Sequence, residues 1–254
     1  MSNGLWTSVK DNVVFVLVSV GVAIALFVIA YLAEKAAKKK NGDTERILST
    51  RKIAMIGVFS AIAMVLHILD FPVPFAPFFY KLDFSEIPAM IGAFAFGPVA
   101  GVMIEFCKIL LKLLVKGTST AFVGDLANFV VGCSFILPAS IIYMFKKTKK
   151  NAIAASVTGT LIMTVFGSLF NAIYLLPAFA ALYGMPLDSI VAIGTEINGN
   201  ITSVSTLVLF AVAPLNLLKG GSVSLVTMLV YKKLSPILKT GTISRKEKAV
   251  EAVR

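Results

Sequence analysis

The side chains with the clearest chemical potential in this chain lie in the stretch 80–88, at the start of an apolar segment. Lys81, Asp83 and Glu86 place one positive and two negative charges there. The loop before them, 71–79, is rich in phenylalanine and proline. A charged stretch beside aromatic rings is suited to close over a flat ligand that has polar edges. We therefore predict that this loop is a lid over a binding site.

Three more polar side chains interrupt apolar segments, where each is costly and marks a candidate functional site. They are Asn171, Asn216 and Lys219. Because Asn216 and Lys219 are three residues apart, they share one face of a helix. An amide offers a donor and an acceptor, and a lysine adds a positive donor, so the set is suited to a heterocycle with imide-like edges. The alternative is that the asparagines only bond neighbouring helices and that the lysine extends to the membrane interface.

A stripe of charged residues at helical spacing forms a second candidate set. It contains Glu105, Lys108, Lys112 and Lys116, which a lipid-facing surface would not tolerate. These side chains could line a substrate cavity. The interpretation that we prefer is that they pair with Asp125 or with Glu105, and that the outer lysines extend to the interface.

The chain has a single histidine and two cysteines. We interpret His67, near the end of an apolar segment, as an interfacial residue rather than a catalyst or a metal ligand. Cys107 and Cys133 both fall within apolar segments, which favours packing over a disulfide or a metal site. The sequence therefore predicts no metal site and no catalytic residue.

Composition shows what kind of elements must position these residues. The chain is 57% hydrophobic and 15% charged, with a mean hydropathy of +0.89, which is typical of a membrane protein and excludes an ordinary soluble domain. The net charge is +11, and the basic residues gather around 35–52, 146–150 and 232–248. Basic clusters beside apolar spans indicate cytoplasmic loops rather than a nucleic-acid surface.

A spanning helix needs about 20 mostly apolar residues. On that basis we predict seven helices, at 12–33, 53–69, 84–96, 99–115, 121–145, 152–176 and 203–231. The fold class is an all-α membrane protein with a six-helix core and one extra N-terminal transmembrane helix. We divide the chain into the extra helix at 1–34, a basic cytoplasmic linker at 35–52, a substrate-binding membrane domain at 53–232 and a basic cytoplasmic tail at 233–254.

The positions of the basic clusters also predict the orientation. With all three in the cytoplasm, the N-terminus lies outside and the C-terminus inside. The loops 70–83 and 177–202 then share the outer face, which suits the capture of an external substrate. The first apolar run, about 20 residues long, is longer than a usual signal-peptide core, so we interpret it as an uncleaved helix.

The first core helix carries small residues four positions apart, Gly57 and Ala61. Such a pair permits close contact between helices in a membrane. It serves either internal packing or the docking of another subunit.

These features resemble a known family. The stretch 81–88, the pattern of Gly117, Gly124, Asp125 and Asn128, and the segment 214–220 are similar to the substrate-binding S components of energy-coupling factor (ECF) transporters. Within that family the chain is most similar to the riboflavin-specific members. The resemblance covers roughly residues 50 to 235, and the helix at 12–33 departs from the six-helix pattern.

The resemblance implies a function and a set of partners. Such a component binds riboflavin with high affinity from outside and associates with a shared transmembrane coupling subunit and two ATPase subunits. It is not an enzyme, it uses no cofactor other than riboflavin as the transported ligand, and it binds no nucleic acid. It lies among membrane lipids of the bacterial plasma membrane as a multi-pass protein. Consistent with this role, the chain has no phosphate-binding Gly-x-x-x-x-Gly-Lys-Ser/Thr motif.

The resemblance also implies site residues. It places ring contacts on Asn171, Asn216 and Lys219, a ribityl contact near Asp83, and partner docking on Gly57 and Ala61. The predicted substrate-binding residues are Asn171, Asn216, Lys219, Asp83, Lys81, Glu86 and Phe79.

Three alternatives remain at this point. An S component for another vitamin, such as thiamine, biotin or a pantothenate-like molecule, would share the fold. An intramembrane enzyme acting on lipid would need a cluster of acids and histidines or a nucleophile with a base, which this chain lacks. A self-powered secondary transporter would usually show inverted repeats and broken helices.

Overall fold

The structure is a computed structural model that describes the backbone of residues 13–251 and the side chains of residues 17–234. The helices are α2 (Val13–Asn41), α3 (Thr50–Ile68), α4 (Glu86–Phe96), α5 (Pro98–Lys116), α6 (Val123–Phe145), α7 (Lys149–Phe170), α8 (Leu176–Tyr183), α9 (Leu187–Ile197), α10 (Val204–Leu207) and α11 (Ala213–Glu251). Two π-helical turns, η1 (Asn171–Leu175) and η2 (Val208–Val212), join α7 to α8 and α10 to α11. A two-stranded antiparallel hairpin pairs β1 (Phe71–Pro72) with β2 (Lys81–Leu82).

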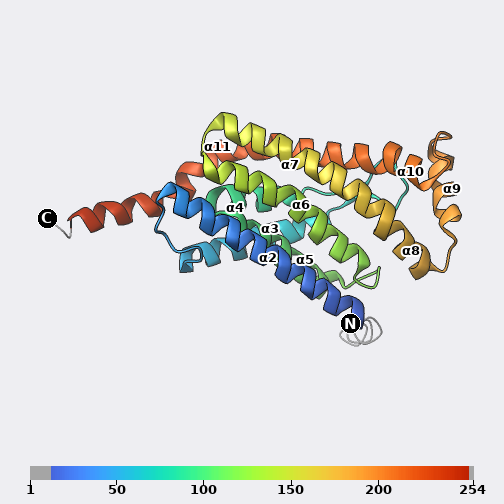
Figure 1. Cartoon of the computed structure of the whole chain (residues 1–254), viewed down its shortest axis with the longest axis horizontal. Helices are drawn as coiled ribbons and strands as arrows, with labels where there is room; N and C mark the ends of the chain where they lie inside the picture. The colour runs from blue at the N-terminus through green and yellow to red at the C-terminus, as the bar shows by residue number, and fades with distance from the viewer. Residues whose placement is uncertain (1–12, 252–254) are drawn as a thin grey trace.

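The long helices run side by side along the long axis of the molecule (Figure 1). The start of α2 and the helices α8, α9 and α10 lie at one end, and the C-terminus of the chain lies at the other. We refer to the end that carries α8, α9 and α10 as the hairpin end, because the β1–β2 hairpin packs there against Phe179 of α8 and Ile190 of α9.

Five helices within the described part of the chain are long and apolar enough to cross a membrane. They span Leu17–Asn41, Thr50–Ile68, Val123–Phe145, Lys149–Tyr183 and Val204–Leu234. The other two predicted segments are also helical but differ in kind. Helix α4 has 11 residues, so it is only about 16 Å long against a hydrocarbon core of about 30 Å. Helix α5 has 19 residues and carries the charged stripe.

Two predicted boundaries differ from the observed ones. Helix α2 continues to Asn41, and α7, η1 and α8 form one rod that reaches Tyr183. The predicted outer loop at 177–202 therefore contains the end of that rod and a further helix, α9. Apolar residues at helical spacing bury one face of α9: Ile190, Val191 and Gly194 are all buried.

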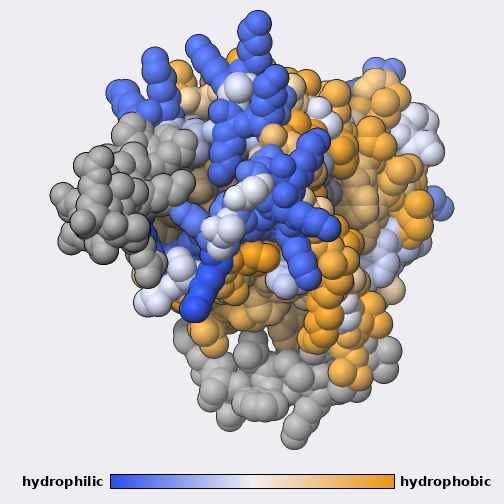
Figure 2. Space-filling model, turned by 60° about the vertical axis from the view of Figure 1, so that its left-hand side comes forward, coloured by the Kyte–Doolittle hydropathy of each residue, from blue (hydrophilic) through white to orange (hydrophobic). Residues whose placement is uncertain are grey.

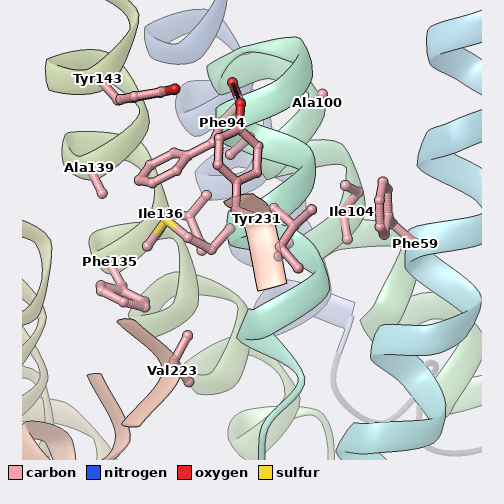
Figure 3. Packing of buried hydrophobic residues seen from close by; sticks show 14 of the residues in the cluster. Phe59, Phe94, Ala100, Ile104, Phe135, Ile136, Ala139, Tyr143, Val223 and Tyr231 are labelled. Carbon is pink, nitrogen blue, oxygen red and sulfur yellow. Dashed lines mark hydrogen bonds between the residues drawn. The ribbon is translucent and has the colours of Figure 1, made fainter. Parts of the chain in front are cut away.

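The largest apolar cluster lies where α3, α4, α5, α6, α7 and α11 meet. Figure 3 shows the rings of Phe94, Tyr143 and Tyr231 gathered together in it. The Phe94 and Tyr143 rings stack with centroids 4.5 Å apart, and the Tyr231 hydroxyl donates to the carbonyl of Phe94 at 3.3 Å. Because α4 contributes to this cluster on nearly every side, the short helix is fixed at the centre of the bundle.

Helix α2 packs on α5 and α6 as an integral part of the bundle. The Phe27 ring meets the edge of Phe106 with centroids 5.6 Å apart. The buried carboxylate of Glu34 accepts a hydrogen bond from the backbone N–H of Val99 at 3.0 Å, in the first turn of α5. An acidic side chain at this position satisfies a backbone N–H group that has no partner within the helix, and the positive end of the helix dipole stabilises its negative charge. The extra helix therefore fastens the α4–α5 junction.

The end of the molecule opposite the hairpin end is strongly hydrophilic. Figure 2 shows hydrophilic residues gathered on it, with hydrophobic residues along the flank of the bundle. The exposed lysines there belong to three separate connections and ends of helices: Lys39, Lys40, Lys146, Lys147, Lys149, Lys150, Lys232 and Lys233.

Candidate functional site

Asp83 is the centre of a buried charged cluster at the point where the hairpin joins α4. Its Oδ2 lies 3.0 Å from the ammonium of Lys219 on α11 and 3.5 Å from Nδ1 of His67 on α3. Its Oδ1 accepts a hydrogen bond from the backbone N–H of Ser85 at 2.9 Å. Burial alone would raise the pKa of Asp83, but the charge of Lys219 and the contact with His67 hold this pKa well below its ordinary range. The carboxylate is therefore charged at neutral pH.

Glu86, in the first turn of α4, connects two lysines. Its Oε2 lies 3.0 Å from the Lys219 ammonium, and its Oε1 lies 3.3 Å from the Lys108 ammonium on α5. Glu86 and Lys108 are almost completely buried. Charges so far from water are stable only when they are paired, which explains why these side chains from α4, α5 and α11 converge.

The two predicted asparagines meet at Gly167 of α7. The Asn171 amide nitrogen donates to the carbonyl of Gly167 at 2.8 Å. A Cβ atom at Gly167 would stand 2.8 Å from the amide nitrogen of Asn216, so only glycine lets α11 bring Asn216 this close. Asn171 and Asn216 are both buried, and Lys219 follows Asn216 by one turn. The structure thus brings Asn171, Asn216, Lys219, Asp83 and Glu86 into one region.

Each asparagine lies at or just after a π-helical turn. Asn171 begins η1, and η2 ends four residues before Asn216. A π turn widens the helix by one residue and occurs frequently at functional sites. Both turns start six residues before a proline, Pro177 and Pro214. Proline removes a backbone donor and clashes with the carbonyl four residues earlier, which a wider turn relieves.

The hairpin is connected directly to this site. The Tyr80 hydroxyl donates to Asn171 Oδ1 at 2.9 Å. Burial raises the pKa of Tyr80, so the hydroxyl keeps its proton and remains a donor at all physiological pH values. The Phe79 ring lies against Tyr80, with centroids 4.7 Å apart, and against Phe179 of α8 at 6.4 Å. The predicted lid loop therefore contacts Asn171 and has an aromatic inner layer.

Lys81 is the predicted site residue that the structure does not bring to the cluster. Its side chain is 45% exposed, and its ammonium lies 3.1 Å from Asp70 at the base of the hairpin. Alternation along β2 explains the difference, because Lys81 points outward while its neighbour Leu82 is buried.

The interpretation of His67 as an interfacial residue is wrong. His67 is only 8% exposed, and it joins the cluster through Asp83. The sequence did hold a sign of this contact: His67 lies at the end of α3, and only the hairpin separates α3 from the charged stretch 80–88. No group of three or more metal-binding side chains occurs among the described residues.

The charged stripe on α5 pairs internally, as the preferred interpretation predicts. Lys112 lies 2.6 Å from Asp125 on α6, and Lys108 lies 2.6 Å from Glu105. What the sequence did not reveal is that Lys108 also contacts the site through Glu86. Cys107 and Cys133 are free cysteines, and Cys133 is fully buried in an apolar cluster.

Gly57 and Ala61 lie on a side of α3 that no other part of the described chain covers. Both residues are exposed, and a Cβ atom added at Gly57 would meet nothing within 4 Å. Small residues with this exposure leave a flat strip on which another helix can approach closely.

The arrangement is suited to binding rather than to reaction. Two amides, an ammonium group and a carboxylate offer both donors and acceptors beside aromatic rings. Such a set can read the polar edge of a planar ligand and hold its faces by packing.

Comparison with known proteins identifies the family to which this architecture belongs. The family model for the substrate-specific component of ECF transporters matches residues 51–231. The riboflavin transporter FmnP of Bacillus subtilis (strain 168) is 32% identical over 190 residues, which cover 74% of this chain and 94% of that protein. The riboflavin transporter RibU of Staphylococcus aureus (strain TCH60) is 35% identical over 189 residues, covering 74% and 93%.

A solved structure of the S component of a bacterial ECF transporter has the same fold. It matches with a TM-score of 0.58 and 36% identity, and the match covers 74% of this chain and 98% of the other. Helix α2 lies before the matched region. The hairpin, the site and all of the six-helix core except the first residue of α3 and the end of α11 fall within residues 51–231, and the chain belongs to the family of substrate-specific S components of ECF transporters.

Proposed function

We propose that this chain is a riboflavin-binding subunit that takes up the vitamin together with an ATP-driven coupling module. The observation that carries the proposal is the convergence of Asn171, Asn216, Lys219 and Asp83 in a chain 32–35% identical to riboflavin transporters over more than nine tenths of their length. Family membership also removes the alternative of an intramembrane lipid enzyme.

The roles of the site residues follow from riboflavin's chemistry. The isoalloxazine ring is flat and mostly apolar, with a polar pyrimidine edge. The amides of Asn171 and Asn216 and the ammonium of Lys219 would bind that edge, and Phe79 would cover a ring face. Asp83 would accept hydrogen bonds from ribityl hydroxyls. Glu86 acts by holding Lys219, since its second oxygen is already used by Lys108.

The test is titration of the detergent-purified protein with riboflavin, followed by quenching of flavin fluorescence. We expect saturable quenching at one ligand per chain. Thiamine and biotin serve as competitors. If the folded protein does not bind riboflavin but binds thiamine or biotin, that vitamin replaces riboflavin as the proposed ligand and the family assignment stands.

The proposed partners are the transmembrane coupling subunit and two ATPase subunits. The exposed strip at Gly57 and Ala61 is the proposed docking face, because small residues permit close helix contact. It lies on α3, whereas the extra helix α2 covers α5 and α6. The extra helix therefore leaves this strip accessible.

The proposed orientation puts the hydrophilic, lysine-rich end in the cytoplasm and the hairpin end outside (Figure 2). It implies a cytoplasmic linker around 42–49, a cytoplasmic tail after the six-helix domain and an external N-terminus. Single cysteines at Lys149 and at Asp188, in a variant without the two native cysteines, test it in whole cells. A membrane-impermeant maleimide should label only the position at Asp188, and labelling only at Lys149 would reverse the orientation.

A further inference from the structure

Lys108 is a fully buried member of the charged cluster around Asp83. It projects from the middle of α5 and its side chain is 0% exposed. Its ammonium group donates hydrogen bonds to Ser85 Oγ at 2.9 Å and to Glu86 Oε1 at 3.3 Å, and it forms an ion pair with Glu105 Oε2 at 2.6 Å. A buried ammonium is stable only when it is paired in this way.

Two branches lead from Lys108 to groups that face the ligand. In one branch, Ser85 accepts from Lys108 through its hydroxyl and donates its backbone N–H to Asp83 at 2.9 Å. In the other, Glu86 accepts from Lys108 with one oxygen and pairs with Lys219 through the other. One ammonium group on α5 thus fixes the place of both Asp83 and Lys219, which come from different parts of the chain.

The third contact keeps Lys108 itself in place. Glu105 lies one turn earlier on α5 and is fully buried. A Cβ atom at Gly132 of α6 would stand 2.5 Å from its Oε2, so the glycine leaves the space that the carboxylate occupies. Helices α5 and α6 are therefore shaped together around this ion pair.

The charge balance of the cluster shows how sensitive it is to Lys108. Asp83, Glu86 and Glu105 contribute three carboxylates, and Lys108 and Lys219 contribute two ammonium groups. Removal of Lys108 leaves three buried carboxylates around one ammonium. Glu86 would then lose the partner of its Oε1, and Glu86 and the Lys219 ammonium paired with it could shift together.

We propose that Lys108 is a positioning residue of the substrate site, which sets the places of Lys219 and Asp83 without touching the ligand. The inference rests on the proposed function, because riboflavin is the ligand whose binding it predicts. It assigns a binding role to α5, a helix that carries none of the predicted contact residues.

The experiment compares Lys108→Met with Lys112→Met in full-length protein. Lys112 is the matched control. It lies one turn further along α5, and its substitution breaks a partly buried pair with Asp125, for which no link to Asp83 or Lys219 is seen among the described residues. We expect both variants to lower the Tm. Only Lys108→Met should weaken riboflavin binding of the folded fraction, by about tenfold or more, while Lys112→Met stays within about twofold of wild type.

The double variant Lys108→Met/Glu105→Gln separates charge balance from positioning. It keeps the wild-type excess of one carboxylate, so its Tm should recover relative to Lys108→Met, and it serves if the single variant does not fold. Its riboflavin affinity should stay about tenfold weak, because Ser85 and Glu86 still lack their donor.

The outcomes are distinct. Folded Lys108 variants with wild-type affinity would overturn the inference and leave the proposed function standing, and so would equal weakening by Lys112→Met. Absence of riboflavin binding by the wild type would overturn the proposed function and this inference with it.

Discussion

At the scale of single residues, the site is made of buried polar groups that satisfy one another. Asp83, Glu86 and Lys219 are held by ion pairs, and Asn171 is held by Tyr80 and by the carbonyl of Gly167. Preformed pairing of this kind lowers the cost of ordering side chains when a ligand binds. The site is therefore built to present a fixed pattern of donors and acceptors.

Loss of one amide should weaken ligand binding in a predictable way. We expect Asn216→Ala to reduce riboflavin affinity by about ten- to a hundredfold, since an unpaired buried partner costs about 1–3 kcal/mol. Fluorescence titration measures the effect. Asn128→Ala is the control, because within the described part of the chain that amide bonds only to the carbonyl of Gly124 in its own helix. Unchanged affinity of a folded Asn216→Ala protein would refute the role given to Asn216.

The depressed pKa of Asp83 predicts a pH dependence of stability. A carboxyl whose pKa is lower in the folded than in the unfolded state stabilises the fold fully above the ordinary aspartate pKa of about 3.9, and loses that effect as the pH falls through the folded-state pKa. The Tm difference between wild type and Asp83→Asn should therefore persist from pH 7 to about pH 4 and shrink below that. A difference that already vanishes near pH 6 would contradict a charged, paired Asp83.

Sequence reasoning singled out the proposed contact residues but not the pairings that hold them in place. Asn171, Asn216 and Lys219 stand out because polar groups are rare within apolar segments. The partnership of Lys219 with Asp83 joins residues 136 positions apart, and no local pattern encodes such a contact. His67 was misinterpreted and Lys108 was assigned only its helical neighbour for the same reason.

At the scale of elements, the hydrophobic pattern predicted six long helices and the short helix α4. It did not predict α9, although apolar residues at Leu187, Ile190 and Val191 follow helical spacing, because that helix is short and lies between longer spans. The π turns were also missed. Their signal in the sequence was the pair Pro177 and Pro214, each six residues after the start of a turn.

The close contact of α7 with α11 at Gly167 gives an element-scale prediction. Gly167→Ala would place a methyl group 2.8 Å from the Asn216 amide, so it should push that side chain away and weaken riboflavin binding about tenfold or more. Gly221→Ala is the control. Gly221 lies on α11, as Asn216 does, and a Cβ there would meet nothing within 4 Å. Riboflavin titration of the two folded variants measures the effect. Equal affinities would show that the α7–α11 contact at Gly167 is not tight.

At the scale of the whole molecule, internal packing, the proposed ligand site and the proposed docking strip involve different surfaces of the chain. Helix α2 covers α5 and α6, the loop between β1 and β2 contacts Asn171 through Tyr80, and the Gly57 and Ala61 strip on α3 stays open. The lysine-rich end and the hairpin end are opposite (Figures 1 and 2). The proposed ligand site and the proposed docking strip therefore lie on separate parts of the molecule.

This separation predicts that docking can be lost without loss of binding. Gly57→Leu should fill the strip on α3 and abolish co-purification with the coupling subunit, while riboflavin affinity stays within about twofold of wild type. Gly21→Leu is the control, since a Cβ at Gly21 on α2 also meets nothing within 4 Å but lies on the extra helix. Co-purification that survives Gly57→Leu and fails with Gly21→Leu would move the docking face to α2.

The π turns have a consequence for how the chain tolerates changes of length. Each turn adds one residue to a helix, and each residue of an α-helix turns the chain by about 100°. A one-residue deletion within Val208–Val212 would therefore return the wide turn to ordinary α-helix and keep the direction of Asn216 and Lys219, whereas the same deletion in the α-helical residues 213–215 would rotate both side chains away from Asn171 and Asp83. In this fold the ligand site is encoded by the phase of two helices as much as by the identity of its side chains.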